Sequence, residues 1–132
     1  MTNIGDSKYK ALIEQSLDGI VLTDEQGNIE VWNKSMVTIT RVQQSDAIGR
    51  PLWEIQSRLI PEEQKTPELL EQIRNGLKFI LESKIEWPGE SMEHLIVCSD
   101  GTRKVVQHSS FVVKTDTGMN FGVILRDITE RK

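Results

Sequence analysis

The chain has 132 residues, a net charge of −4 at pH 7, and a single cysteine, which rules out an internal disulfide. The length predicts one domain with a single hydrophobic core. The acidic balance and the absence of a basic block argue against a nucleic-acid surface, because contacts to phosphates dominate such binding. No apolar run reaches the length of a membrane span, and the N-terminus lacks the features of a signal peptide. We therefore expect a cytoplasmic location, which leaves open a membrane anchor elsewhere in a longer parent protein.

The first predicted element is an amphipathic helix, which Asp6 or Ser7 can cap. Its apolar residues recur at helical spacing and are Tyr9, Leu12, Ile13 and Leu17. This stripe must be buried either against the domain's own sheet or against a partner, and the sequence leaves both open. We assign residues 1–17 to this flanking helix and residues 18–129 to the main domain.

Two short strands are expected next, at residues 19–23 and 29–32, because both are rich in β-branched residues. Residues 24–28 predict a tight turn between them, where Gly27 and Asn28 tolerate left-handed backbone angles.

Helices are predicted to fill the middle of the chain. Asn33 suits the cap of a short helix at 34–40, and residues 43–48 predict another helical turn. Pro67 favours the start of a long helix, since the amide it lacks has no partner in a first turn. The break at residues 87–89 is expected to end this helix. Its apolar face consists of Leu69, Leu70, Ile73, Leu77, Ile80 and Leu81.

Three strands are predicted to complete the chain, at residues 94–98, 104–113 and 119–125, with turns at 99–102 and 114–118. Two strands, several helices and three further strands predict an α+β fold. We expect a five-stranded antiparallel sheet with helices packed on one face.

The last residues, 126–132, change from apolar to charged and helix-compatible. Asp127 or Thr129 can accept a hydrogen bond from the free amides of a starting helix. One turn of helix is not stable alone, so we interpret residues 130–132 as the start of a longer connector helix.

Six short motifs occur in order along the chain, and these are Asp18–Asp24, Gly27–Ile29, Trp32-Asn33, Gly49–Pro51, Asp100–Thr102 and Asp127–Lys132. Together they resemble a PAS domain of the kind found in bacterial and archaeal sensor histidine kinases and related signalling proteins. The resemblance implies a small pocket between the sheet and the helices. It also implies a sensory or dimerising module, usually a homodimer, that feeds a following helix. Asp127 and Thr129 match the positions where the last strand of the family passes into that output helix.

Known cofactor sites of the family do not match this chain. Haem-binding relatives place a histidine on the long helix before the third strand, and residues 67–83 contain none. The Asn-Cys-Arg-Phe-Leu-Gln motif of LOV photoreceptors is absent, and no cysteine is suitably placed for a p-coumarate chromophore. The cofactor is therefore unknown. Cys98, on a predicted strand, is interpreted as a small buried hydrophobe.

Alternate residues of two predicted strands point inward in the family's register. The resulting pocket candidates, with one residue of the closing strand, are His94, Ile96, Cys98, Val106, His108, Ser110 and Leu125. A hairpin would bring His94 and His108 opposite or diagonal to each other. Two imidazoles and a thiol can bind a transition metal or hydrogen-bond a small anion, although we assign no metal site. Alternatively each histidine bonds a backbone carbonyl or faces solvent, and a one-residue slip would turn Gln107 and Ser109 inward.

Other chemistry has weaker support. Trp32, Trp53 and Trp87 can stack on a flat ligand but are more typical of a core or an interface. No nucleophile elbow, phosphate loop or zinc-protease motif occurs. We expect no enzyme activity in this segment, and a histidine kinase as the full-length parent.

Two interpretations of function follow. In the first, a small-molecule ligand biases the output helix and so controls a kinase or another output domain in the same chain. In the second, the domain is a ligand-free interaction module, whose outward-facing Val105, Phe111 and Val113 contribute to a constitutive homodimer. The predicted dimer residues are Tyr9, Leu12, Ile13, Leu17 and Phe111. Neither interpretation involves nucleic acid or contact of this segment with a membrane.

Overall fold

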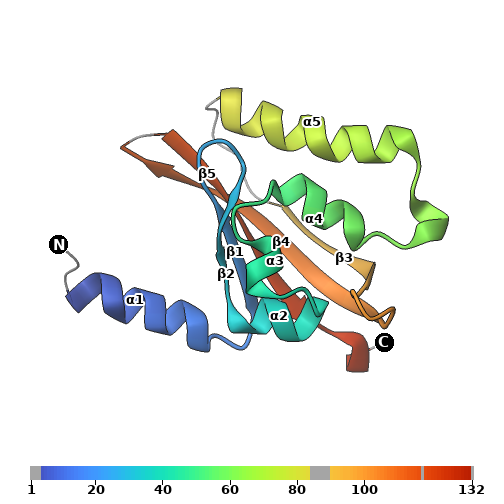
Figure 1. Ribbon diagram of the computed structural model, residues 1–132, viewed down its shortest axis with the longest axis horizontal. Helices are drawn as coiled ribbons and strands as arrows, with labels where there is room; N and C mark the ends of the chain where they lie inside the picture. Colours follow the sequence, from blue (N-terminus) through green and yellow to red (C-terminus); the bar gives the residue numbers. More distant parts are fainter. Residues whose placement is uncertain (1–3, 84–89, 117, 132) are drawn as a thin grey trace.

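The computed structural model describes residues 4–83, 90–116 and 118–131. Five antiparallel strands form one sheet in the spatial order β2-β1-β5-β4-β3. Their bounds are β1 Gly19–Thr23, β2 Ile29–Trp32, β3 Glu90–Val97, β4 Arg103–Thr115 and β5 Gly118–Asp127. Helices α2 to α5 lie on one side of the sheet, and α1 projects away on the other (Figure 1). The predicted α+β fold is therefore confirmed.

The helices are α1 Ile4–Gln15, α2 Lys34–Thr40, α3 Gln44–Ala47, α4 Leu52–Arg58 and α5 Pro67–Ser83, with 3-10 turns η1 Glu62–Gln64 and η2 Thr129–Arg131. Helices α2 and α5 have the predicted bounds, whereas the predicted break at 87–89 lies outside the described residues. The prediction for α1 was wrong at its end. The helix stops at Gln15, so Leu17 lies in the connection to β1 rather than on the helical stripe. No helix among the described residues combines the length and hydropathy needed to cross a bilayer.

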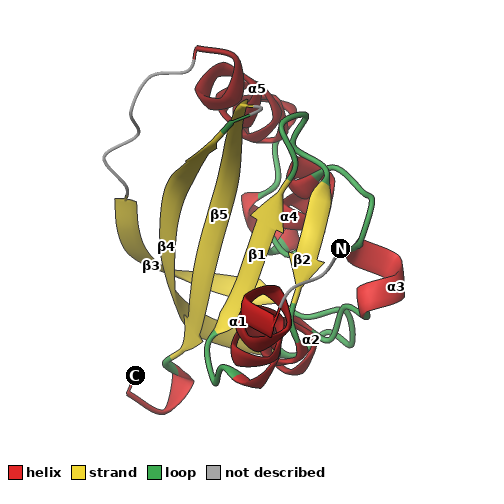
Figure 2. Cartoon of the chain, turned by 90° about the vertical axis from the view of Figure 1, so that its left-hand side faces the viewer, coloured by secondary structure: helices red, strands yellow, loops and turns green. Residues whose placement is uncertain are grey.

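The core lies between the inner face of the sheet and the helices. Val21 of β1 and Val123 of β5 are paired neighbours in the centre of the sheet, and both are buried. Gly19 lets α2 approach β1 closely, because a Cβ atom there would lie 2.4 Å from Sδ of Met36. The opposite face of the sheet is uncovered over most of its area (Figure 2).

Strand β5 extends two residues beyond its predicted end. Arg126 pairs with Gln107 and Asp127 pairs with Val106, so both belong to the sheet. The sequence suggested a helical connector because the residues are charged. Arg126 can occupy a strand because its guanidinium projects outward and binds the carboxylate of Asp18 at 3.2 Å.

Asn33, the N-cap of α2, joins three segments of the chain. Its Oδ1 accepts hydrogen bonds from the amides of Ile20 at 2.8 Å and Met36 at 3.1 Å. Its Nδ2 donates to the carbonyls of Ile13 at 2.7 Å and Asp18 at 3.1 Å. The side chain is fully buried, so each of these groups would lose its partner in a place that water does not easily reach.

We predict that Asn33→Ala lowers the free energy of unfolding by about 2–4 kcal/mol, because several buried polar groups lose their partners along with a helix cap. Chemical denaturation followed by circular dichroism measures this change. Lys34→Ala at the adjacent exposed position is the control and is expected to change stability by less than about 0.5 kcal/mol. Equal effects of the two substitutions would contradict the role assigned to Asn33.

Candidate functional site

A cavity of about 360 Å³ lies between the inner face of the sheet and helices α2, α4 and α5. This volume is within the range of small-molecule sites in proteins. The strands contribute Val21, Trp32, Met92, His94, Leu95, Ile96, His108, Val123 and Leu125. The helices and the segments between them contribute Met36, Leu52, Ile55, Gln56, Leu59, Ile60, Pro61, Gln64, Leu69 and Ile73.

The two histidines of the protein meet at the wall of this cavity. His108 pairs with Met92 and His94 pairs with Val106, so the histidines occupy diagonal positions on the β3–β4 hairpin. Their ring centroids are 5.3 Å apart with an interplanar angle of 75°, an edge-to-face arrangement. Nδ1 of His108 is buried and has no hydrogen-bond partner within the described part of the chain. His108 thus lines the cavity and carries a buried polar atom whose hydrogen-bonding capacity is unused among the described residues.

Burial keeps both imidazoles neutral near pH 7. Desolvation lowers the pKa of His108 to about 4, and the nearby His94 adds to this shift. The pKa of His94 is also lowered by burial, against the opposing effect of a hydrogen bond with the Leu95 backbone. Since neither ring carries a charge at neutral pH, the pair does not supply the positive field that a small anion would need.

The remaining pocket candidates separate into two groups. Ile96 and Leu125 line the cavity with the histidines, whereas Val106 is fully buried in the core and Ser110 is buried without lining the cavity. Cys98 lies beyond the end of β3, where its thiol donates to the carbonyl of Ile39 at 3.1 Å and burial raises its pKa. The thiol and the two imidazoles do not converge, and the described residues contain no group of three potential metal ligands.

The three tryptophans have different environments. Trp32 lines the cavity, is buried, and donates its indole N–H to the carbonyl of Val42 at 3.0 Å. Trp53 lies elsewhere, with the guanidinium of Arg74 5.2 Å from its ring centroid, a cation–π contact. Trp87 is outside the described residues.

The helices contribute residues to the cavity that were not predicted from the sequence. Met36 faces β1 from α2, and Gln56 of α4 and Gln64 of η1 are the polar residues on the helical side. The one feature of the sequence that pointed to these residues is the apolar stripe of α5. Its members Leu69 and Ile73 line the cavity and are only half-buried. A stripe of this kind predicts burial, but it does not show whether the facing space is filled.

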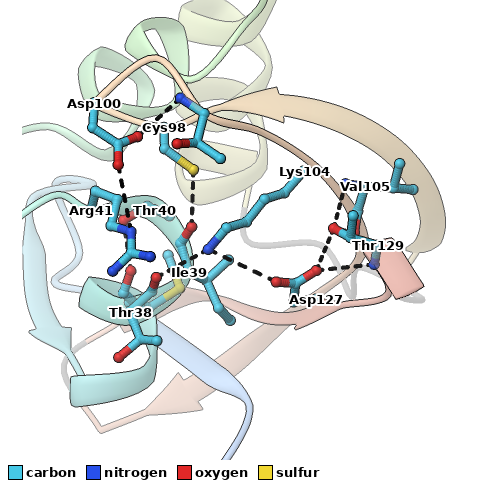
Figure 3. A network of polar contacts seen from close by, with 12 residues as sticks. Thr38, Ile39, Thr40, Arg41, Cys98, Asp100, Lys104, Val105, Asp127 and Thr129 are labelled. Atoms are coloured by element: carbon cyan, nitrogen blue, oxygen red, sulfur yellow. Dashed lines mark hydrogen bonds and ion pairs between the residues drawn. The ribbon is translucent and has the colours of Figure 1, made fainter. Parts of the chain in front are cut away.

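The exit from β5 is fixed by a compact set of hydrogen bonds (Figure 3). Oδ1 of Asp127 accepts from the amide of Thr129 at 3.0 Å and from its hydroxyl at 2.6 Å. The Thr129 hydroxyl oxygen accepts from the amide of Val105 at 3.1 Å, and the amide of Ile128 donates to the carbonyl of Val105 at 2.9 Å. The segment that leaves the sheet is therefore held against β4.

Lys104 lies between this junction and the end of α2. Its ammonium donates to the carbonyl of Thr38 at 3.2 Å and lies 3.9 Å from Oδ2 of Asp127. Only 13% of the lysine side chain is exposed. Three further carbonyls at the end of α2, those of Ile39, Thr40 and Arg41, accept from the thiol of Cys98 and the amide and hydroxyl of Ser99. Carbonyl groups at a helix C-terminus have no partner within the helix, so the β3–β4 hairpin supplies theirs.

Helix α1 presents apolar side chains without cover from the described part of the chain. Tyr9 is 65% exposed and Leu12 is 67% exposed, while Leu17, beyond the helix, is 94% exposed. Ile13 is half-buried and its carbonyl is bound by Asn33. Exposed apolar groups this close together are typical of an interaction surface.

The outer face of the sheet carries the remaining dimer candidate. The ring of Phe111 packs over Gly122, where a Cβ atom would lie within 2.4 Å of two ring carbons, so the residue is half-buried by its own sheet. Val113 and Ile124 are each 37% exposed on this face, and Val105 is half-buried. The face is thus moderately apolar.

A family model described as a PAS domain matches residues 17–130, and the chain belongs to this family. PAS domains are sensory modules of signalling proteins rather than catalytic domains. No curated protein sequence matches the chain.

Solved structures share the fold. A PAS domain of a protein from Colwellia psychrerythraea is 25% identical, with a TM-score of 0.68 over 98% of this chain and 100% of the other. A PAS domain from a two-component sensor histidine kinase is 11% identical, with a TM-score of 0.61 over 93% and 98% of the two chains. A PAS domain in complex with ethanol, from a LuxR-family transcriptional regulator of Burkholderia thailandensis, is 16% identical, with a TM-score of 0.61 over 91% and 96%.

We predict that His108 makes the fold less stable in mild acid. Its pKa of about 4 in the folded protein lies below the usual 6.5, so the unfolded chain binds this proton first as the pH falls. The contribution of the neutral ring is complete above pH 6.5 and is lost as the pH falls toward 4. Between pH 7 and pH 5, the free energy of unfolding should therefore fall in both proteins, but by about 1–2 kcal/mol less in His108→Leu than in the wild type.

Urea denaturation at the two pH values measures this difference. Gln107→Leu, the outward-facing neighbour, adds the same side chain without removing a titrating group and should behave as the wild type does. An identical pH dependence in the wild type and His108→Leu would refute the assignment of a buried neutral imidazole.

Proposed function

We propose that residues 18–129 form a ligand-responsive sensory PAS domain that reports occupancy of the cavity through the junction at Asp127 and Thr129. The observation that carries the proposal is the position of Leu125, which lines the cavity only two residues before Asp127 on the same strand. A shift of β5 caused by an occupant would move the junction directly. Only a ligand that binds one arrangement better than another can bias this equilibrium.

A second physical connection supports the same proposal. Met36 lines the cavity from α2, and the C-terminal carbonyls of that helix are bound by the β3–β4 hairpin. Lys104 of β4 contacts both Thr38 of α2 and Asp127. A movement of α2 in response to a ligand would therefore change the surroundings of the Asp127 carboxylate. Burial raises the pKa of this group, but its hydrogen bonds to Thr129 and the charge of Lys104 together outweigh burial and lower the pKa.

The relatives agree with this function at a general level. One similar PAS domain was solved with ethanol bound, and another comes from a sensor histidine kinase. We infer a cytoplasmic module in a parent of that kind. Residues 130–132 would begin the connector to a kinase or another output domain.

A ligand-free dimerisation module is the second candidate function. The exposed Tyr9 and Leu12 of α1 favour it, because burial of these side chains needs a surface that the described part of the chain does not provide. The two functions are compatible if residues 1–17 dimerise a sensor. We therefore propose a homodimer in which α1, Leu17 and the outer sheet face around Phe111 contribute to the interface.

Native mass spectrometry of freshly purified protein tests both functions. We expect a dimer carrying a bound small molecule, with a mass on the order of 100–300 Da for a site of this size. Leu12→Glu should shift the protein toward the monomer, because a charge would be buried in the interface. Lys10→Glu on the exposed side of the same helix is the control.

A cavity-filling substitution shows where an added mass resides. Val123→Phe places a ring inside the cavity and should abolish the added mass, whereas Ile124→Phe, the outward neighbour, should retain it. If Val123→Phe does not fold, Leu125→Phe serves in its place. An empty wild-type dimer that also fails to bind added small molecules would leave only the interaction module.

We predict that Thr129→Val loosens the output junction without unfolding the domain. The amide of Val105 would lose its acceptor, so its hydrogen exchange should be at least about 10-fold faster, as expected for loss of one hydrogen bond. Thr38→Val is the matched control and should leave exchange at Val105 unchanged, because it removes an exposed hydroxyl bonded to Lys34 and keeps the backbone carbonyl that Lys104 binds. Unaltered exchange in Thr129→Val would remove the junction from the proposed relay.

A further inference from the structure

We propose that the cavity selects uncharged small molecules that have an apolar body and one hydrogen-bonding group, which the His94–His108 pair binds. This inference rests on the proposed ligand-binding function and specifies the chemistry of the same site. It differs from the expectation of an anionic ligand or a metal ion that the histidines raised in the sequence.

The lining has no fixed charge. The described residues around the cavity include no Lys, Arg, Asp or Glu. Their polar side chains are Gln56, Gln64, His94 and His108. The indole N–H of Trp32 is already hydrogen-bonded to the carbonyl of Val42. An ion that entered would lose hydration without gaining a partner of opposite charge. The chemistry of the wall thus opposes anions and cations alike.

The size of the cavity fits a small ring compound or a short branched chain. A cavity of 150 Å³ lined by apolar side chains is large enough for benzene, and this one has about 360 Å³. Leu52, Ile55 and Val123 are among the buried apolar residues that face it, so most of an occupant's surface would contact hydrocarbon.

The histidine pair supplies polar recognition on the β3–β4 side of this apolar space. A neutral imidazole has one donor and one acceptor nitrogen, and Nδ1 of His108 has no partner among the described residues. A hydroxyl group on the ligand can satisfy such an atom in either tautomer of the ring, because a hydroxyl both donates and accepts. The ring of His94 lies edge-to-face with that of His108.

Four probes of nearly the same shape test this selectivity in calorimetric titrations of the purified chain: benzyl alcohol, toluene, benzoate and benzylammonium. We expect benzyl alcohol and toluene to bind, and each charged probe to bind at least about 100-fold more weakly than benzyl alcohol, because desolvation of an ion is not compensated. Binding of the neutral probes should be lost in Val123→Phe and kept in Ile124→Phe.

His108→Leu tests the polar contact. The preference for benzyl alcohol over toluene should fall by about 3- to 10-fold, the effect of one neutral hydrogen bond. Ser109→Ala, the outward-facing neighbour, should leave the preference unchanged. A measurement on the wild type avoids any folding defect of the variant: the ring nitrogen signals of His108, one of only two histidines, should shift with benzyl alcohol and not with toluene.

The outcomes separate this inference from the proposed function. If benzoate or benzylammonium binds within 10-fold of benzyl alcohol, the cavity is a ligand site but the selectivity proposed here is wrong. The same conclusion holds if neither His108→Leu nor the ring signals distinguish the two neutral probes. If none of the four probes binds, or if Val123→Phe binds them as the wild type does, both the selectivity and the proposed ligand-binding function are wrong.

Discussion

The pairing of β4 with β5 is the constraint on which the other features of the molecule depend. Ten residue pairs run from Val106–Asp127 to Thr115–Gly118, and both strands are buried along much of their inner face. His108 and Leu125 form one of these pairs, and both line the cavity. A hydrogen-bonded ladder resists sliding of one strand past its neighbour. The wall of the cavity and the end of β5 at Asp127 belong to the same ladder.

The end of helix α2 adds a second constraint that ties the helical layer to the same strands. Its last carbonyl groups would be unsatisfied without donors from the β3–β4 hairpin and from Lys104. A lysine with so little exposure is costly unless its ammonium is bound, and its two acceptors belong to different parts of the fold. Thr38 is part of the helical layer, and Asp127 is the last residue of the sheet. A change in either position alters the contacts of the other.

Local signals in the sequence were enough to predict the elements but not the cavity. The cap at Asn33 and the proline at position 67 predicted helices α2 and α5. The register of the family placed His94 and His108 opposite or diagonal to each other, and the structure has them diagonal. Cys98 was predicted as a pocket candidate and as a small buried hydrophobe. It is buried but does not line the cavity, because the tertiary fold brings a carbonyl of α2 to its thiol. The end of β5 was missed for a similar reason: Asp127 is in the sheet because Val106 pairs with it, and polarity alone suggests a connector.

Two features of the cavity cost folding free energy, and the same kind of occupant would remove both costs. Apolar side chains that line a cavity make fewer dispersion contacts with protein atoms than those in a filled core. A buried imidazole nitrogen without a partner adds the cost of desolvation. A neutral molecule with an apolar body and a hydroxyl group would fill the space and satisfy His108, and it would stabilise the folded state over the unfolded chain by mass action. Filling the space with larger side chains of the protein would remove the first cost permanently but would leave no binding energy to bias β5 and α2. In the proposed function, the cavity and the His108 nitrogen are therefore the features through which a ligand would change the state of the domain.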